Sequence, residues 1–140
     1  MAEIDATRFG ISNGAVTVAS MILAMRVAGA PKRHILTALL ALLITDPIGD
    51  AHSMYVADKG EGRKKTFMLS FGSQFAVQLF FVCTVLLLPA RWWLPVGMPT
   101  AALMVWFTTH HWHQRVMSAA VIAVTTAVSV GVTHLEKHEI

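Results

Sequence analysis

The chain has 140 residues, of which 55% are hydrophobic and only 14% are charged. Water-soluble domains carry about 25% charged residues, so this composition excludes an ordinary soluble domain and predicts an integral membrane protein. The formal charge of +3 is spread over short polar segments. That pattern is typical of topology signals beside lipid headgroups and does not indicate a partner nucleic acid. The polar, acidic N-terminus lacks a signal-peptide pattern, so the first apolar segment is expected to be retained.

Five apolar segments follow one another along the chain, separated by short polar or proline-containing connections. We therefore expect an all-α membrane protein in which residues 1–140 form a single domain of five transmembrane helices. The expected segments are, roughly, Phe9 to Ala30, His34 to Asp58, Thr66 to Leu88, Leu94 to His110 and Arg115 to His134.

The distribution of Lys and Arg predicts the orientation of these helices. The basic loop Lys59 to Lys65 outweighs the other connections, which places the loop and the N-terminus in the cytoplasm and the C-terminus outside it. The short chain has no transit peptide, so we expect a bacterial or archaeal inner membrane. The single cysteine, Cys83, excludes an intramolecular disulfide.

The second apolar segment contains acids where lipid is expected. Asp46, Asp50, Met54 and Asp58 are spaced by four residues and form a stripe on one helix face. A carboxylate at mid-membrane costs on the order of 3 kcal/mol, so these acids need partners. Three carboxylates and a thioether suit a divalent transition ion such as Fe²⁺ or Mn²⁺. The alternatives are interior acids hydrogen-bonded to neighbouring helices or paired with Arg26, and an Asp58 that caps its helix.

Polar residues on two neighbouring segments are candidate partners for the acids. Asn13 lies on a small, polar face of the first segment, where a carboxamide needs partners and offers a neutral oxygen ligand. The third segment carries a polar stripe of Ser70, Ser73, Gln74 and Gln78. This stripe indicates interhelical hydrogen bonds, or a wet cavity if it faces Asp46 or Asp50.

The run FGISNGAVT, from Phe9 to Thr17, precedes a hairpin and a second helix that contains Ser53, Met54 and Asp58. These two stretches resemble the vacuolar iron transporter family, in particular its nodulin-like branch with a short loop between helices two and three. Members of the family read FG-x-N-D-G-L-V-T/S in the first helix. In their second helix, a glutamate precedes an S-M pair and a G-E pair. Asp46 takes the place of the first glutamate here, and Asp58 that of the second.

The resemblance implies a homodimer of five-helix subunits that carries Fe²⁺ or Mn²⁺ along a path between the subunits, coupled to protons. Two positions depart from the family pattern. Asn13 replaces the family's aspartate, and an amide cannot carry a proton. The basic loop Lys59 to Lys65 replaces the family's long glutamate-rich insert. We expect Asp50 to replace the acid missing at Asn13.

These observations predict a divalent-metal transporter that binds its ion through Asn13, Asp46, Asp50, Met54 and Asp58. No nucleophile and base pair is apparent, so an enzyme is not expected, nor is a resident cofactor. One alternative is a non-transporting membrane partner or regulator with the same fold. Another is a small haem-binding membrane protein with axial ligands from His110 or His113 and from His52 or His134. The cluster of His110, His111 and His113 equally fits interfacial residues around Trp112.

Overall fold

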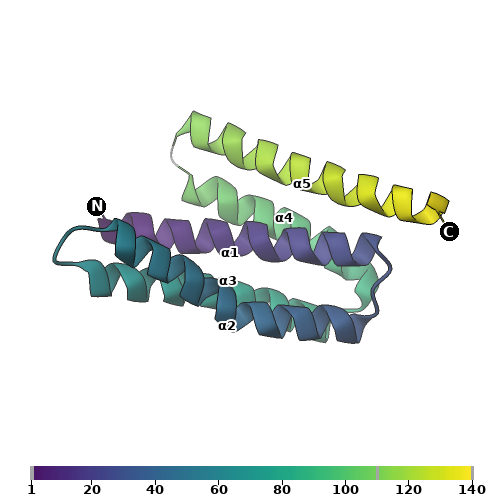
Figure 1. The fold of residues 1–140 in the computed structure, drawn as a ribbon, viewed down its shortest axis with the longest axis horizontal. Coiled ribbons are helices and arrows are strands. Elements are labelled where there is room, and N and C mark those ends of the chain that lie inside the picture. The colour runs from purple at the N-terminus through teal and green to yellow at the C-terminus, as the bar shows by residue number, and fades with distance from the viewer. Residues whose placement is uncertain (1, 110, 140) are drawn as a thin grey trace.

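The computed structural model describes residues 2–109 and 111–139, and in these residues the chain forms five helices. Consecutive helices run antiparallel, and short turns join them at the two ends of the molecule (Figure 1). The prediction of five helices and no strands is confirmed for the described residues. The helices are α1 (Ala2–Val27), α2 (Lys32–Ala57), α3 (Arg63–Leu87), α4 (Ala90–Thr108) and α5 (Trp112–Glu139).

Several helix ends differ from the expected boundaries: α1 begins at Ala2 and not Phe9, α5 ends at Glu139 and not His134, and α4 begins at Ala90 and not Leu94. The paired tryptophans Trp92 and Trp93 are expected before the fourth helix, but α4 includes them. Pro89 takes the N-cap position with φ −59° and ψ 148°, values that its ring favours at a helix start. The indole Nε1 of Trp93 donates to the carbonyl oxygen of Leu88 at 2.9 Å and ties the first turn of α4 to the end of α3.

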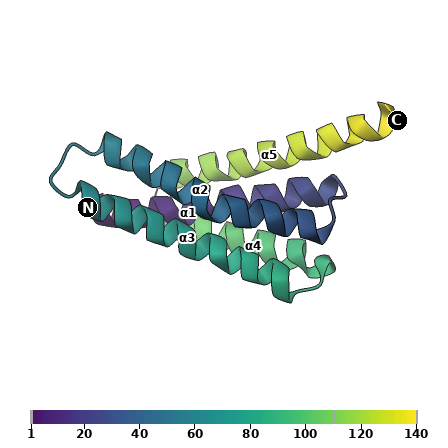
Figure 2. The same cartoon turned by 60° about the horizontal axis from the view of Figure 1, so that its bottom comes forward.

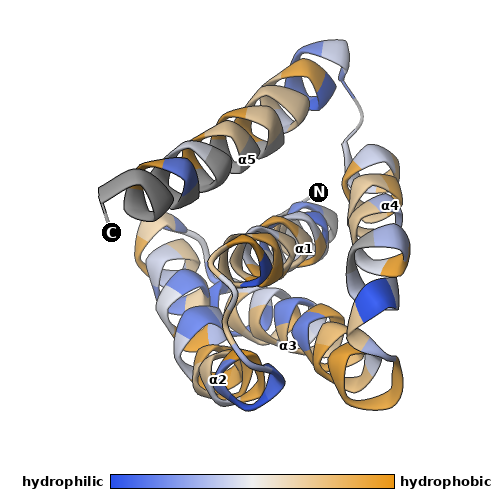
Figure 3. Ribbon diagram, turned by 90° about the vertical axis from the view of Figure 1, so that its right-hand side faces the viewer, coloured by the Kyte–Doolittle hydropathy of each residue, from blue (hydrophilic) through white to orange (hydrophobic). Residues whose placement is uncertain are grey.

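Helix α1 lies at the centre and contacts each of the other four helices, as the end-on view in Figure 3 shows. Its contact with α3 is close because α1 carries glycines at the crossing. A Cβ atom added to Gly10 would lie 2.6 Å from the carbonyl oxygen of Ser70, and one added to Gly14 would lie 3.1 Å from Cγ of Gln74. Small residues at this spacing allow helix backbones to approach one another.

Helices α2 and α3 lie side by side along much of their length (Figure 2). Their exposed surface differs from that of a soluble protein, and α3 also buries polar side chains. Four polar side chains of α3 are buried, whereas large apolar side chains of α2 and α3 are exposed. The buried set is Thr66, Ser70, Gln74 and Gln78, and the exposed set includes Leu40, Ile44, Ile48, Met68, Phe80 and Leu87.

Among the described residues, three helices are long and apolar enough to cross a membrane. They cover Asp5–Val27, Lys32–Ala57 and Arg63–Leu87. Together with the apolar exterior, this finding suggests an integral membrane protein. The five-span arrangement, the orientation and the homodimer stay predictions.

Candidate cation site

Two carboxylates of α2 meet three carboxamides of α1 and α3 in the interior. Asp46 accepts hydrogen bonds at its Oδ2 atom from Nε2 of Gln74 at 2.7 Å and from Nε2 of Gln78 at 2.6 Å. Asp50 accepts at its Oδ2 atom from Nε2 of Gln74 at 2.7 Å and from Nδ2 of Asn13. The structure therefore brings together Asn13, Asp46 and Asp50 of the predicted site. It also confirms that Gln74 and Gln78 make interhelical hydrogen bonds.

Helix geometry explains why these side chains meet. Gln74 and Gln78 are four residues apart on α3, as Asp46 and Asp50 are on α2, so each pair occupies one face of its helix. Because the two helices are antiparallel neighbours, the stripes face each other. Gln74 bridges both acids since its carboxamide nitrogen carries two hydrogens.

Three buried oxygen atoms beside this cluster have no hydrogen-bond partner among the described residues. They are Oγ of Ser70 and the Oε1 atoms of Gln74 and Gln78. Both glutamine side chains are almost completely buried, so these oxygens are removed from solvent. A buried acceptor without a partner is unfavourable, and a cation or an ordered water would satisfy it.

Among the residues whose placement is described, the hydrogen-bond partners of the two carboxylates are the uncharged side chains of Asn13, Gln74 and Gln78. The alternative that pairs them with Arg26 is not what the structure shows, because the Arg26 guanidinium carbon lies 5.6 Å from the ring centre of Trp93. Hydrogen bonds from amides stabilise a carboxylate but leave its charge in place. Two carboxyl groups one turn apart, held by neutral amides, are therefore a candidate cation site.

Asp58 lies outside this cluster, at the C-cap of α2. Its Oδ1 atom accepts from the backbone N–H of Gly60 at 2.8 Å, and its Oδ2 atom accepts from the hydroxyl of Thr66 at 3.0 Å. These two bonds lower the pKa of the Asp58 carboxyl, and Arg63 lowers it further. Asp58 thus joins the end of α2 to the start of α3, roughly 12 Å along the helix from Asp50.

Met54 is half-buried and lies one turn beyond Asp50 on α2. Among the residues whose placement is described, no three His, Cys, Asp or Glu side chains lie close enough together to hold a metal ion. An ion at this site would therefore depend on two carboxylates, with amide oxygens and the Met54 thioether as further ligands.

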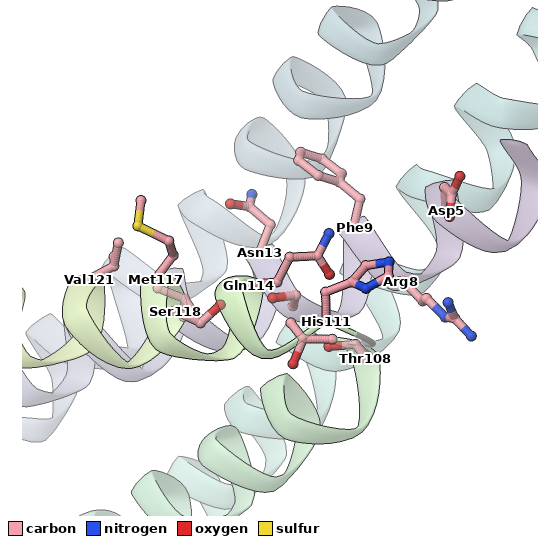
Figure 4. A pocket seen from close by; sticks show the side chains of 13 residues that line it. Asp5, Arg8, Phe9, Asn13, Thr108, His111, Gln114, Met117, Ser118 and Val121 are labelled. Atoms are coloured by element: carbon pink, nitrogen blue, oxygen red, sulfur yellow. The ribbon is translucent and has the colours of Figure 1, made fainter.

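A cleft of about 840 Å³ lies beside the acids, between α1, the end of α4 and the start of α5 (Figure 4). Asn13 lines this cleft and also donates to Asp50, so one side chain separates the cleft from the acid pair. The remaining lining residues are Asp5, Arg8, Phe9, Ser12, Val16, Thr108, Thr109, His111, Gln114, Met117, Ser118 and Val121.

Arg115 stabilises the junction of α4 and α5 beside the cleft. Its guanidinium carbon lies 4.1 Å from the ring centre of Trp106, and its Nε donates to the carbonyl oxygen of Thr109 at 3.2 Å. This cleft is not predicted by the sequence pattern. The one local sign of the cleft in the sequence is the set of polar residues on both sides of the α4–α5 connection, such as Thr108 and Gln114.

The predicted histidine cluster is divided between two elements. Helix α4 ends at Thr108, and Thr109 takes the C-cap position in an extended conformation, so the histidines do not lie at the end of α4 as expected. His111 lies in the connection and lines the cleft, whereas His113 is exposed in the first turn of α5. His110 lies outside the described residues. The other candidate haem ligands, His52 and His134, are exposed on α2 and α5.

Comparisons of the chain with protein-family models, with curated proteins and with solved structures found no match. The likeness of its first two helices to the vacuolar iron transporters therefore stays a prediction from the motifs.

Proposed function

We propose that this chain carries a divalent transition-metal ion, Fe²⁺ or Mn²⁺, across a membrane, and that Asp46 and Asp50 form its ion site. The observation that carries the proposal is the pair of carboxylates held by three carboxamides between apolar helices. Ionisable residues that face the interior of a helical membrane protein mark ion pathways. One divalent cation neutralises both carboxylates, which removes most of the cost of burying them.

The carboxamides of Gln74 and Gln78 suit both an empty site and a site that holds a cation. In the structure, the N–H groups of Gln74 and Gln78 point at the carboxylates, and their oxygens have no partner among the described residues. Rotation of a carboxamide about its last bond exchanges nitrogen and oxygen. Such a rotation turns Oε1 of each glutamine toward a bound cation as a neutral ligand, and it gives each unpartnered oxygen a role.

The choice of metal rests on Met54 and on the resemblance. Carboxylate and amide oxygens alone would suit Mg²⁺ and Ca²⁺ equally. A thioether is a softer ligand, so Met54, one turn from Asp50, favours a transition ion when the ion passes it.

The cleft supplies a route to the site. It reaches Asn13 from the end of the molecule that holds Asp5 and Arg8, and Asn13 bonds directly to Asp50. An ion that enters the cleft replaces the Asn13 amide as the partner of Asp50. If transport is coupled to protons, Asp46 and Asp50 carry them, because the amide of Asn13 cannot.

Uptake of Mn²⁺ into vesicles that contain the purified chain tests the proposal. Asp50→Asn and Asp46→Asn each keep the size of the side chain but remove a charge, and we expect each to abolish uptake. Glu61→Gln is the matched control, because Glu61 is exposed in the α2–α3 connection, and it should retain uptake. Equal uptake by the wild type and both aspartate variants would overturn the proposed site.

A non-transporting regulator with the same fold is the second candidate. It is favoured by the four amide hydrogen bonds that already engage the carboxylates and by the exposed cations Arg63, Lys64 and Lys65 in the first turn of α3, which repel other cations. The vesicle experiment separates the two candidates. A folded wild-type chain that gives no Mn²⁺ flux with or without a pH gradient is a regulator, not a carrier.

A further inference from the structure

The turns from α1 to α2 and from α3 to α4 lie at the same end of the molecule (Figure 1), and cationic residues lie in the helix ends beside these turns. They are Arg26 in the last turn of α1, Lys32 and Arg33 at the start of α2, and Arg91 at the start of α4. The acids whose side chains the structure describes lie elsewhere. Asp46 and Asp50 are in the middle of α2, and the others are near the opposite end of the molecule, at Asp5, Asp58 and Glu61.

Trp93 is the centre of this cationic cluster. Its side chain is only 2% exposed. The Arg26 guanidinium carbon lies 5.6 Å and the Lys32 Nζ atom 5.8 Å from its ring centre. Lys32 Nζ also donates to the carbonyl oxygen of Leu86 at 3.2 Å. Two cations are thus held against one buried indole at the junction of α1, α2, α3 and α4.

Arg26 has an unused donor in this cluster. Its Nε atom is buried and has no hydrogen-bond partner in the part of the chain that the structure describes. A buried donor on a charged group costs free energy unless it is satisfied, and a guanidinium matches the oxygens of a phosphate.

Two helix N-termini add to the attraction for an anion. Helices α2 and α4 begin after Pro31 and Pro89, and neither start has a side-chain cap or an acidic residue in its first turn. The third N–H of each helix, from His34 or Trp92, donates to the proline carbonyl oxygen, which leaves the two N–H groups before it for an anion. The helix dipoles also favour negative charge there.

Exposed apolar side chains border the cationic cluster. They indicate that the bound anion is the headgroup of a lipid and not a free ion. Leu87 is 82% exposed, and Leu86 and Trp92 are exposed beside it. A free anion in water makes no favourable contact with these apolar side chains. A phospholipid places acyl chains along the leucines and its headgroup beside the tryptophan, as is typical of membrane interfaces.

We propose that Arg26 and Lys32, which lie against Trp93, and Arg91, which lies against Trp92, bind the phosphate of an anionic phospholipid in the leaflet at this end of the molecule. The cations and the uncapped helix starts contact the headgroup, and Leu86 and Leu87 contact its acyl chains. This lipid site does not depend on the proposed ion carrier.

Thermal unfolding of the full chain in vesicles tests this proposal. Vesicles of phosphatidylcholine alone are compared with vesicles that also contain phosphatidylglycerol. We expect the anionic lipid to raise the unfolding temperature of the wild type by several degrees. The double variant Arg26→Gln, Lys32→Gln should lose most of this rise. The matched control Arg63→Gln, Lys64→Gln removes the same charge at the opposite end and should keep it.

If the anionic lipid raises the unfolding temperature of the Arg26→Gln, Lys32→Gln variant as much as that of the wild type, the proposed site is wrong. The rise would then be only a general effect of surface charge. Inorganic phosphate added to the phosphatidylcholine vesicles is the second arm. If phosphate alone reproduces the rise, the site takes a free anion and the lipid proposal is wrong. Should the double variant fail to fold, Arg33→Gln, Arg91→Gln changes only exposed side chains. This variant should lose part of the rise, and no loss would again overturn the site.

Discussion

Asn13, Gln74 and Gln78 hold two acids in the interior without a single positive charge. An arginine or lysine in their place would neutralise the carboxylates permanently and leave no affinity for a second cation. Carboxamides make hydrogen bonds to charged groups worth about 1.5–3 kcal/mol each and leave the charges available. This choice of partner is what favours an exchangeable ion at Asp46 and Asp50 over a purely structural pair.

Asp58 should make the stability of the protein depend on acidic pH. The bonds from Gly60 and Thr66 hold its folded-state pKa below the ordinary value of 3.8, so the folded protein binds fewer protons there than the unfolded chain. Its contribution to the free energy of unfolding is therefore complete above about pH 4 and is lost as the pH falls through the folded-state pKa. Thermal unfolding in detergent at about pH 6 and about pH 3 measures the loss, and Asp58→Asn should show a smaller loss than the wild type.

Glu61→Gln is the control for this prediction, because Glu61 is exposed in the same connection. It should behave like the wild type. An identical pH dependence in Asp58→Asn would contradict a stabilising role of the Asp58 carboxylate.

At the level of the helices, the close contact of α1 with α3 positions the cation site. Asn13 reaches Asp50 only because the α1 backbone approaches α3 at Gly10 and Gly14. The polar face of α1 therefore has a packing role and a binding role at once. Its glycines let α1 pack closely against α3, and its asparagine donates a hydrogen bond to Asp50.

Gly10→Ala should separate α1 from α3. The added Cβ would lie 2.6 Å from the carbonyl oxygen of Ser70 and would also overlap Oγ of Ser73, and backbone atoms cannot move aside as a flexible side chain can. Such overpacking costs about 1–3 kcal/mol, so we expect a lower unfolding temperature in detergent and weaker Mn²⁺ uptake.

Gly72→Ala is the matched control on α3, because a Cβ there meets no atom within 4 Å. It should leave stability and uptake unchanged. A Gly10→Ala protein as stable and active as this control would show that the close approach is dispensable.

The interior of the molecule combines an apolar core with one polar cluster, and apolar side chains also cover much of the exterior. The carboxylates and amides lie between α1, α2 and α3, whereas leucines, valines and phenylalanines of these helices face outside. In water this arrangement would be unfavourable, since the hydrophobic effect drives apolar surface inward. In a bilayer it is the favourable one, because lipid covers the exterior and the polar groups satisfy one another.

Single cysteines in a Cys83→Ser background test the arrangement of the helices in the membrane. Ala28 and Glu61 are exposed in connections at opposite ends of the molecule. With the N-terminus in the cytoplasm, Ala28→Cys should react with a membrane-impermeant maleimide on intact cells, and Glu61→Cys only after permeabilisation. The reverse pattern would invert the orientation. Labelling of both sites from one side would contradict a membrane-spanning α2.

Much of the fold could be predicted from local patterns. Long apolar runs separated by Pro31, Gly60, Pro89 and the polar run from His110 to Arg115 predict five helices, because helix formation depends on neighbouring residues and on breakers. The start of α4 was placed too late, since proline and paired tryptophans indicate a connection but are also compatible with a membrane helix. The four-residue spacing correctly placed Asp46 and Asp50 on one face.

The sequence by itself determined the helices, the apolar exterior and the presence of acids that require partners. Only the tertiary structure decided which residues became those partners. Gln74 lies 28 residues from Asp46 and Asn13 lies 37 residues from Asp50 along the chain, and their contacts arise from the packing of α1 and α2 on α3. It also decided that Asp58 caps a helix and that a cleft reaches Asn13. The physical reason is that hydrophobicity and propensity act over a few residues, whereas the choice of facing surfaces depends on how closely whole helices can approach.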